Sequence, residues 1–120
     1  MEQPVITIVS ATVRPEREQQ LIAAYRSVTS VLPSELRQSF LVRRDSPGGS
    51  GGSGRDAHEW RIVSVWRSRE QLDQYRRSVG TQPAIEMLRA AGGDPTMSTF
   101  SVIHQVGHDV LGAPGHGDAR

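Results

Sequence analysis

Three side chains in the second half of the chain could together carry out acid–base and anion chemistry. His104 has an imidazole whose pKa lies near neutrality, so it is the best candidate for a general base. Arg89 is permanently charged and can hold an oxyanion or a carboxylate through two hydrogen bonds. Trp66 offers one indole N–H donor and a large flat surface. We take these three as the candidate catalytic residues.

Four more residues have the size and polarity to line a binding pocket. Tyr25 and Tyr75 are aromatic with a polar tip, and Ile62 and Leu72 add apolar surface. Every candidate also has a purely structural interpretation. Aromatic and apolar residues at helical or strand spacing pack in cores, a helical arginine can face solvent, and a strand histidine can pack inside the protein or at an interface.

Composition excludes several other kinds of active site. The 120 residues contain no cysteine, and all fourteen basic residues are arginine. The chain therefore has no thiol nucleophile, no zinc–thiolate site, and no lysine for a Schiff base or a phosphate loop. Because no histidine pair has helical i, i+4 spacing on a predicted helix, we expect no bound metal.

Charge and hydropathy exclude two classes of partner. The formal net charge is +1, so the chain has no net electrostatic field that would attract nucleic acid or acidic lipid. No apolar run approaches the length of a transmembrane helix, and the first ten residues lack the basic start of a signal peptide. We therefore expect a cytoplasmic protein that binds neither nucleic acid nor membranes.

The hydrophobic pattern predicts the elements that position the candidate residues. Four segments are rich in β-branched and apolar residues and should be strands: residues 4–13, 35–44, 59–67 and 98–106, the last containing His104. Helical spacing follows Pro15 and ends at Pro33. A second helix follows Ser68, which can cap it with Gln71 at the capping-box position. A short third helix begins near Pro83.

This order predicts a ferredoxin-like α+β domain, βαββαβ, with a short extra helix before the last strand. In strand 35–44 we place Leu36, Phe40 and Val42 on one face. The strands carry apolar residues on both faces, and helices can cover only one of them. We therefore predict that two subunits pack sheet to sheet in a homodimer.

The run "GGSGGSG" is ambiguous because it is typical of a flexible linker between two domains. Neither half of the chain has enough elements to close a core of its own. We therefore predict one domain over residues 1–106, with a long Gly/Ser hairpin loop at residues 46–58. Residues 107–120 are rich in glycine and poor in apolar residues, so we predict a flexible C-terminal tail.

The chain resembles a known family, and the motifs that carry the resemblance best lie in its second half. The stretch "IVSVWRSREQLDQY" places a tryptophan at a strand end, then a serine-capped helix with a tyrosine, and "PAIEMLRAA" and "STFSVIHQV" follow. With the first strand "VITIVSATV" and the proline-led helix, this is similar to the antibiotic biosynthesis monooxygenase domain of the dimeric α+β barrel superfamily. The resemblance covers residues 4–106. It implies a homodimer with a pocket inside each subunit, between the sheet and the helices.

The resemblance also implies an activity. Some family members oxidise quinols, anthrones or similar phenolic polyketides with O2, without metal or flavin, and use an Asn, a Trp, a Tyr and an Arg. Trp66 and Arg89 match the Trp and the Arg, which implies that they position and polarise the substrate. His104, chosen above for its imidazole, would take the substrate proton. The Asn and Tyr positions hold Ile62 and Leu72, which we place with Tyr75 and Tyr25 in the substrate-binding set.

Haem is not expected as a cofactor. The haem-degrading branch of the same superfamily uses an Asn, a Trp and a His, and the matching positions here hold Val9, Tyr75 and Leu88. We therefore expect no cofactor. Two hypotheses remain open for the function. One is a cofactor-free monooxygenase, or a related cyclase-like enzyme, which the family resemblance favours. The other is a non-catalytic dimeric module, associated with stress or with binding a small apolar ligand.

Overall fold

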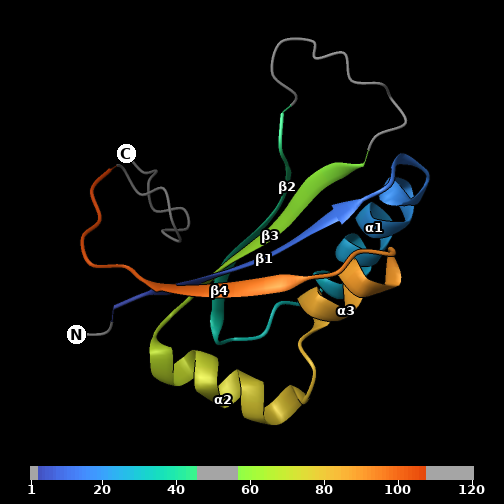
Figure 1. Ribbon diagram of the computed structural model, residues 1–120. Coiled ribbons are helices and arrows are strands. Elements are labelled where there is room, and N and C mark those ends of the chain that lie inside the picture. The colour runs from blue at the N-terminus through green and yellow to red at the C-terminus, as the bar shows by residue number, and fades with distance from the viewer. Residues whose placement is uncertain (1–2, 46–56, 108–120) are drawn as a thin grey trace, which may run out of the picture.

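The computed structural model describes residues 3–45 and 57–107, which form a four-stranded antiparallel sheet and three helices (Figure 1). The elements are β1 (Val5–Val13), α1 (Pro15–Val28), β2 (Leu36–Arg43), β3 (His58–Trp66), α2 (Arg69–Val79), α3 (Pro83–Ala90) and β4 (Thr96–Ser101). The strand order is β2-β3-β1-β4. This is the ferredoxin-like α+β fold, and α3 is the predicted extra helix before the last strand.

The helix starts follow from the residues that begin them. Pro15 and Pro83 occupy the first turns of α1 and α3, where a missing N–H costs nothing and the fixed φ suits a helix. Ser68 caps α2, because its hydroxyl accepts a hydrogen bond of 3.1 Å from the Gln71 backbone N–H. These three helix-start predictions are confirmed.

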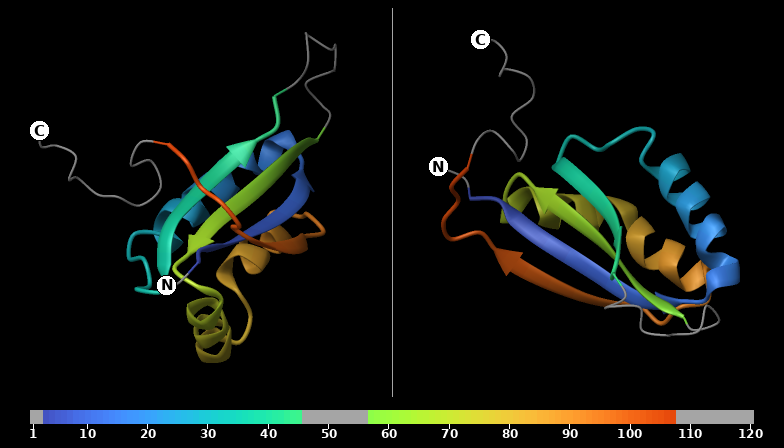
Figure 2. Two further views of the ribbon diagram at one scale, coloured as in Figure 1. Left: turned by 90° about the vertical axis from the view of Figure 1, so that its left-hand side faces the viewer. Right: turned by 90° about the horizontal axis from the view of Figure 1, so that it is seen from above.

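All three helices cover the same face of the sheet, and the core lies between them (Figure 2). Residues 5, 7, 9, 11 and 13 of β1 and residues 60, 62, 64 and 66 of β3 are buried and alternate with less buried neighbours, except that Val65 is buried as well. From the helices, Leu21 and Leu88 are almost completely buried against Val9 and Val13. The period-two burial therefore assigns one face of each central strand to the core.

The opposite face of the sheet is apolar and has no described element over it (Figure 2). Cross-strand pairing places Ile8 beside Val63 on the two central strands of this face. Farther out, the side chains of Phe40, Val42 and Phe100 are 39%, 41% and 50% exposed. The expectation that the sheet is apolar on both faces is therefore confirmed. The name "open face" is used below for this surface, made by Ile6, Ile8, Phe40, Val42, Val63 and Phe100; Val65 points to the same side but is only 3% exposed.

The predicted facing of strand β2 is wrong at one residue. A register irregularity between Leu36 and Gln38 shifts the alternation of β2 against β3. Leu36 pairs with Trp66 and packs with the helix-side core, whereas Phe40 pairs with Val63 on the open face. A β-bulge adds one residue to a strand, so residues on either side of it change parity.

The last strand ends earlier than its apolar pattern predicts. We expected a strand over residues 98–106, but β4 stops at Ser101 and His104 lies beyond it, exposed. β4 pairs only with β1, and its last contact is from the Val102 N–H to the Pro4 carbonyl. Proline has no N–H with which to continue the ladder. The placement of His104 within a strand is therefore wrong.

Two segments of the sequence prediction lie wholly or mainly outside the described residues. The Gly/Ser loop at 46–58 is described only at Ala57 and at His58, the first residue of β3, and the predicted tail at 107–120 only at Gly107. Within residues 3–45 and 57–107, no helix is long and apolar enough to cross a bilayer.

Candidate functional site

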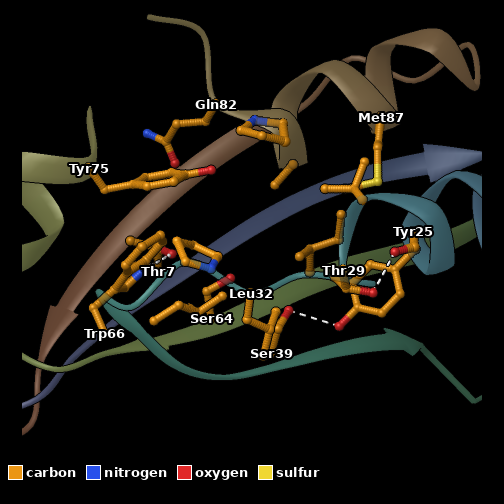
Figure 3. Close-up of a pocket in the computed structure, with 16 residues that line it drawn as sticks. Thr7, Tyr25, Thr29, Leu32, Ser39, Ser64, Trp66, Tyr75, Gln82 and Met87 are labelled. Atoms are coloured by element: carbon orange, nitrogen blue, oxygen red, sulfur yellow. Dashed lines mark hydrogen bonds between the residues drawn. The ribbon is translucent and has the colours of Figure 1, made fainter. Parts of the chain in front are cut away.

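A pocket opens between the helix-covered face of the sheet and the three helices (Figure 3). Its floor comes from β1, β2 and β3, and its walls come from α1, α2, the first turns of α3 and the segment after α1. The hollow measures about 490 Å³ when the open solvent at its mouth is included. The space open to the centres of water molecules is only about 60 Å³, so the pocket is narrow.

One end of the pocket is aromatic. The Trp66 indole Nε1–H donates a 2.9 Å hydrogen bond to the Thr7 hydroxyl, which fixes the ring plane. The Tyr75 ring lies with its centroid 4.9 Å from that of Trp66, tilted by 41°. Burial, and then the nearby Glu35 carboxylate, raise the pKa of Tyr75. Tyr75 therefore keeps its proton at neutral pH and can donate a hydrogen bond but cannot act as a base.

The other end is set by helix α1. The Tyr25 hydroxyl donates to the Ser39 hydroxyl at 2.8 Å, which ties α1 to β2 across the pocket (Figure 3). The Thr29 hydroxyl donates to the Tyr25 carbonyl at 2.6 Å and so closes the last turn of α1. Apolar side chains of Leu32 and Met87 complete this end.

The pocket is electrically neutral. Among the described residues that line it, none is an aspartate, glutamate, arginine or histidine. Its polar groups are the hydroxyls of serine, threonine and tyrosine and the amide of Gln82. The site therefore suits an uncharged, largely flat ligand with a few oxygen atoms.

The structure brings together four of the seven candidate residues. Trp66, Tyr75, Ile62 and Tyr25 line the pocket. Leu72 does not: it is completely buried behind the pocket wall, packed with Val5 and Trp66.

Arg89 and His104 also lie outside the pocket, which removes the predicted anion clamp and the predicted base from its lining. Helix α3 turns Ala84 and Met87 toward the pocket. Arg89, two residues after Met87, projects from a different side of the helix and is exposed. His104 is exposed because β4 has already ended.

Sequence reasoning missed the polar floor. Thr7, Ser64 and Ser39 all line the pocket, and the first two are 2% and 8% exposed. A signal was present, because Thr7 and Ser64 each interrupt an otherwise apolar face of a buried strand. A buried hydroxyl in that position needs a hydrogen-bonding partner from the protein, water or a ligand.

A second polar cluster surrounds Glu18, away from the pocket. The Glu18 carboxylate lies 2.6 Å from His58 Nδ1, accepts 3.1 Å from the Trp60 indole N–H and accepts 3.3 Å from Arg43. The Arg43 guanidinium also lies 5.6 Å from the centre of the Trp60 ring. Burial by itself would raise the pKa of Glu18, but the hydrogen bonds from His58 and Trp60 outweigh it and hold that pKa below 4.5.

Acid should therefore weaken the fold through Glu18. A carboxyl with a lower pKa in the folded chain stabilises the fold above its unfolded pKa, and this stabilisation is lost as pH falls through the folded pKa. We expect the urea concentration at the midpoint of unfolding to decrease once the pH is lower than about 4.5. At pH 7, Glu18→Gln should lower the free energy of unfolding by about 1–3 kcal/mol.

Urea unfolding between pH 7 and pH 3 measures both effects, and Glu70→Gln, which removes an exposed carboxylate from α2, is the matched control. If the urea midpoint of Glu18→Gln decreased with falling pH as steeply as that of the wild type, this role for Glu18 would be contradicted.

Comparison with known proteins agrees with the fold. The chain is similar to a dimeric ferredoxin-like protein from an uncultured marine organism, with 14% identity, a TM-score of 0.63, and coverage of 88% of this chain and 100% of that one. It is also similar to SnoaB, a cofactor-independent oxygenase from Streptomyces nogalater, with 16% identity, a TM-score of 0.59, and coverage of 88% and 99%.

A third similar structure is the hydroxynitrile lyase of Passiflora edulis, with 16% identity, a TM-score of 0.57, and coverage of 89% and 100%. Such low identities show the fold alone, and the fold supports more than one chemistry. No curated protein sequence matches the chain. The family model described as antibiotic biosynthesis monooxygenase matches residues 4–87. This chain therefore belongs to the antibiotic biosynthesis monooxygenase family.

Proposed function

We propose that the chain is a cofactor-free monooxygenase that oxidises a neutral aromatic quinol or anthrone in the pocket beside Trp66. The observation that carries the proposal is the pocket itself: it is narrow, neutral, and walled at one end by the tilted, closely spaced rings of Trp66 and Tyr75. Family membership and the similarity to a cofactor-independent oxygenase support the same activity.

The chemistry balances without a cofactor. An anthrone methylene reacts with O2 to give a carbonyl and one water, so one oxygen atom enters the substrate and the other leaves as water. The substrate supplies the electrons once it has lost a proton. Among the described residues lining the pocket, none is a base at neutral pH. The substrate proton therefore passes to water at the mouth, and the protein contributes binding, orientation and hydrogen bonds to the anion.

The same neutral lining favours a second candidate, a non-catalytic module that binds a small aromatic ligand. A binding site needs no base, and the described lining residues offer none. The two candidates predict different results with one substrate, because only the enzyme consumes oxygen.

Anthrone oxidation in air tests the enzyme directly. We expect oxygen consumption above the buffer rate, and a loss of about tenfold in Trp66→Phe, because one hydrogen bond that orients the pocket is removed. Arg89→Ala is the control; its side chain is exposed outside the pocket, so its rate should be unchanged. Anthrone binding with no rate above buffer would leave the binding module as the function.

We also propose that the protein is a homodimer joined through the open face. Apolar residues on the central strands meet no described element on that side, and a similar structure is named as dimeric. A second copy of the same apolar face can cover this one, and the two copies then form a dimer with twofold symmetry. Light scattering at micromolar concentration should give twice the mass of 13.2 kDa.

A further inference from the structure

The floor of the pocket carries a row of hydroxyl groups that crosses the sheet. Ser64 on β3 pairs with Thr7 on β1 on one side and with Ser39 on β2 on the other. Thr7 pairs in turn with Thr99 on β4. Directly paired residues on one face have Cβ atoms about 4.5–5.5 Å apart, so the four hydroxyls are neighbours. Figure 3 shows Thr7, Ser64 and Ser39 following one another beneath the pocket.

Three members of this row already accept a hydrogen bond from outside it. Thr7 accepts from the Trp66 indole at 2.9 Å, and Ser39 accepts from the Tyr25 hydroxyl at 2.8 Å. Thr99 accepts from the Arg76 guanidinium at 3.3 Å. A hydroxyl has a single proton and two lone pairs, so each of these groups still has its own proton to donate.

Among the described residues, none of the four hydroxyls donates a hydrogen bond to a protein group. Ser64, in the middle, has no side-chain hydrogen bond within the described part of the chain, although it is only 8% exposed. Because the Ser64 hydroxyl faces the pocket, it is free to donate to whatever occupies that space, so the row fits a guest that brings lone pairs. Thr7, Ser64 and Ser39 line the pocket, so the guest that satisfies them is the ligand.

We propose that Thr7, Ser64 and Ser39 form a donor site for an acceptor oxygen of the ligand, either a carbonyl or a phenolate. The inference rests on the proposed function of the pocket and assigns its polar recognition to this row. The row donates to the ligand oxygen without any charged side chain, and its donors are held in place by Trp66 and Tyr25. The ligand oxygen lies over Ser64, and the ring system extends toward Trp66 and Tyr75.

Two flat probes test the row. 1,4-Naphthoquinone has carbonyl oxygens that only accept, and naphthalene has the same rings without oxygen. We expect calorimetry to show that the wild type binds the quinone about tenfold more tightly than naphthalene, the value of one to two hydrogen bonds. Ser64→Ala should weaken quinone binding about fivefold and leave naphthalene binding unchanged, because this substitution removes no partner from another protein group.

Ser98→Ala is the matched control, since Ser98 pairs with Ile8 on the opposite face of the sheet. Equal quinone affinity in wild type and Ser64→Ala would contradict the role of the hydroxyl row in binding the ligand oxygen. It would not contradict the pocket as the binding site. Binding of neither probe to the wild type would overturn the proposed function and the row with it. Unchanged naphthalene binding in Ser64→Ala shows that the variant is folded.

Discussion

Replacing Ile8 with arginine should convert the protein from a dimer to a monomer without unfolding it. Ile8 lies on the central strand β1, on the open face, between Val63 of β3 and Ser98 of β4. In a monomer this position is only half-buried, and the long arginine side chain can extend into water. In a sheet-to-sheet dimer the guanidinium would be buried without a partner, at a cost of several kcal/mol.

The expected result is a rise of at least about a thousandfold in the dimer dissociation constant, since about 4 kcal/mol corresponds to three factors of ten. Size-exclusion chromatography with light scattering measures the mass, and circular dichroism checks the fold. Ala23→Arg is the matched control, because it adds the same charge to the exposed side of α1. A dimer of unchanged affinity in Ile8→Arg would place the interface on another surface.

Replacing Trp66 with alanine should cost about 3–5 kcal/mol of the free energy of unfolding. The side chain is 4% exposed, packs against Leu72 and Val5, and contacts the tilted ring of Tyr75. The substitution also leaves Thr7 without its indole donor. Because the pocket already opens to solvent beside the ring, water can enter the new space, which places the cost toward the lower end of that range.

Urea unfolding followed by circular dichroism measures this loss. Trp66→Phe is the control: it keeps most of the ring volume and removes the N–H, so it should cost about 1–2 kcal/mol. A loss below about 1 kcal/mol in Trp66→Ala would mean that the ring does not hold α2 against the sheet.

The elements of this fold could be predicted from local chemistry. Pro15, Pro83 and Ser68 begin helices for reasons that involve only a few neighbouring residues. Alternation in β1 and β3 reports burial directly, because side chains point to opposite faces at every step. The predictions of the facing of Leu36 and of the end of β4 were wrong because both depend on pairing with a strand that is distant in the sequence. The irregularity after Leu36 is a property of its pairing with β3, and the end of β4 is set by Pro4, the residue just before β1.

The candidate site was predicted only in part for the same reason. Trp66 and Tyr75 are nine residues apart at a strand end and the helix that follows it, so their proximity can be predicted from the chain. Thr7, Ser64 and Ser39 meet through strand register, which the sequence does not state. Glu18 and His58 are forty residues apart and meet for a similar reason, through the packing of α1 on β3.

The Glu18 cluster joins both ends of the segment that connects β2 and β3. Arg43 is the last residue of β2 and His58 is the first of β3, and both contact the same carboxylate on α1. These two contacts hold the adjoining ends of β2 and β3 to α1 without involving the connecting residues. Loop closure costs only about 0.6 kcal/mol for each doubling of loop length. The chain between Asp45 and Ala57 is therefore the natural place for evolution to lengthen this protein, or for an engineer to insert a peptide or a second domain.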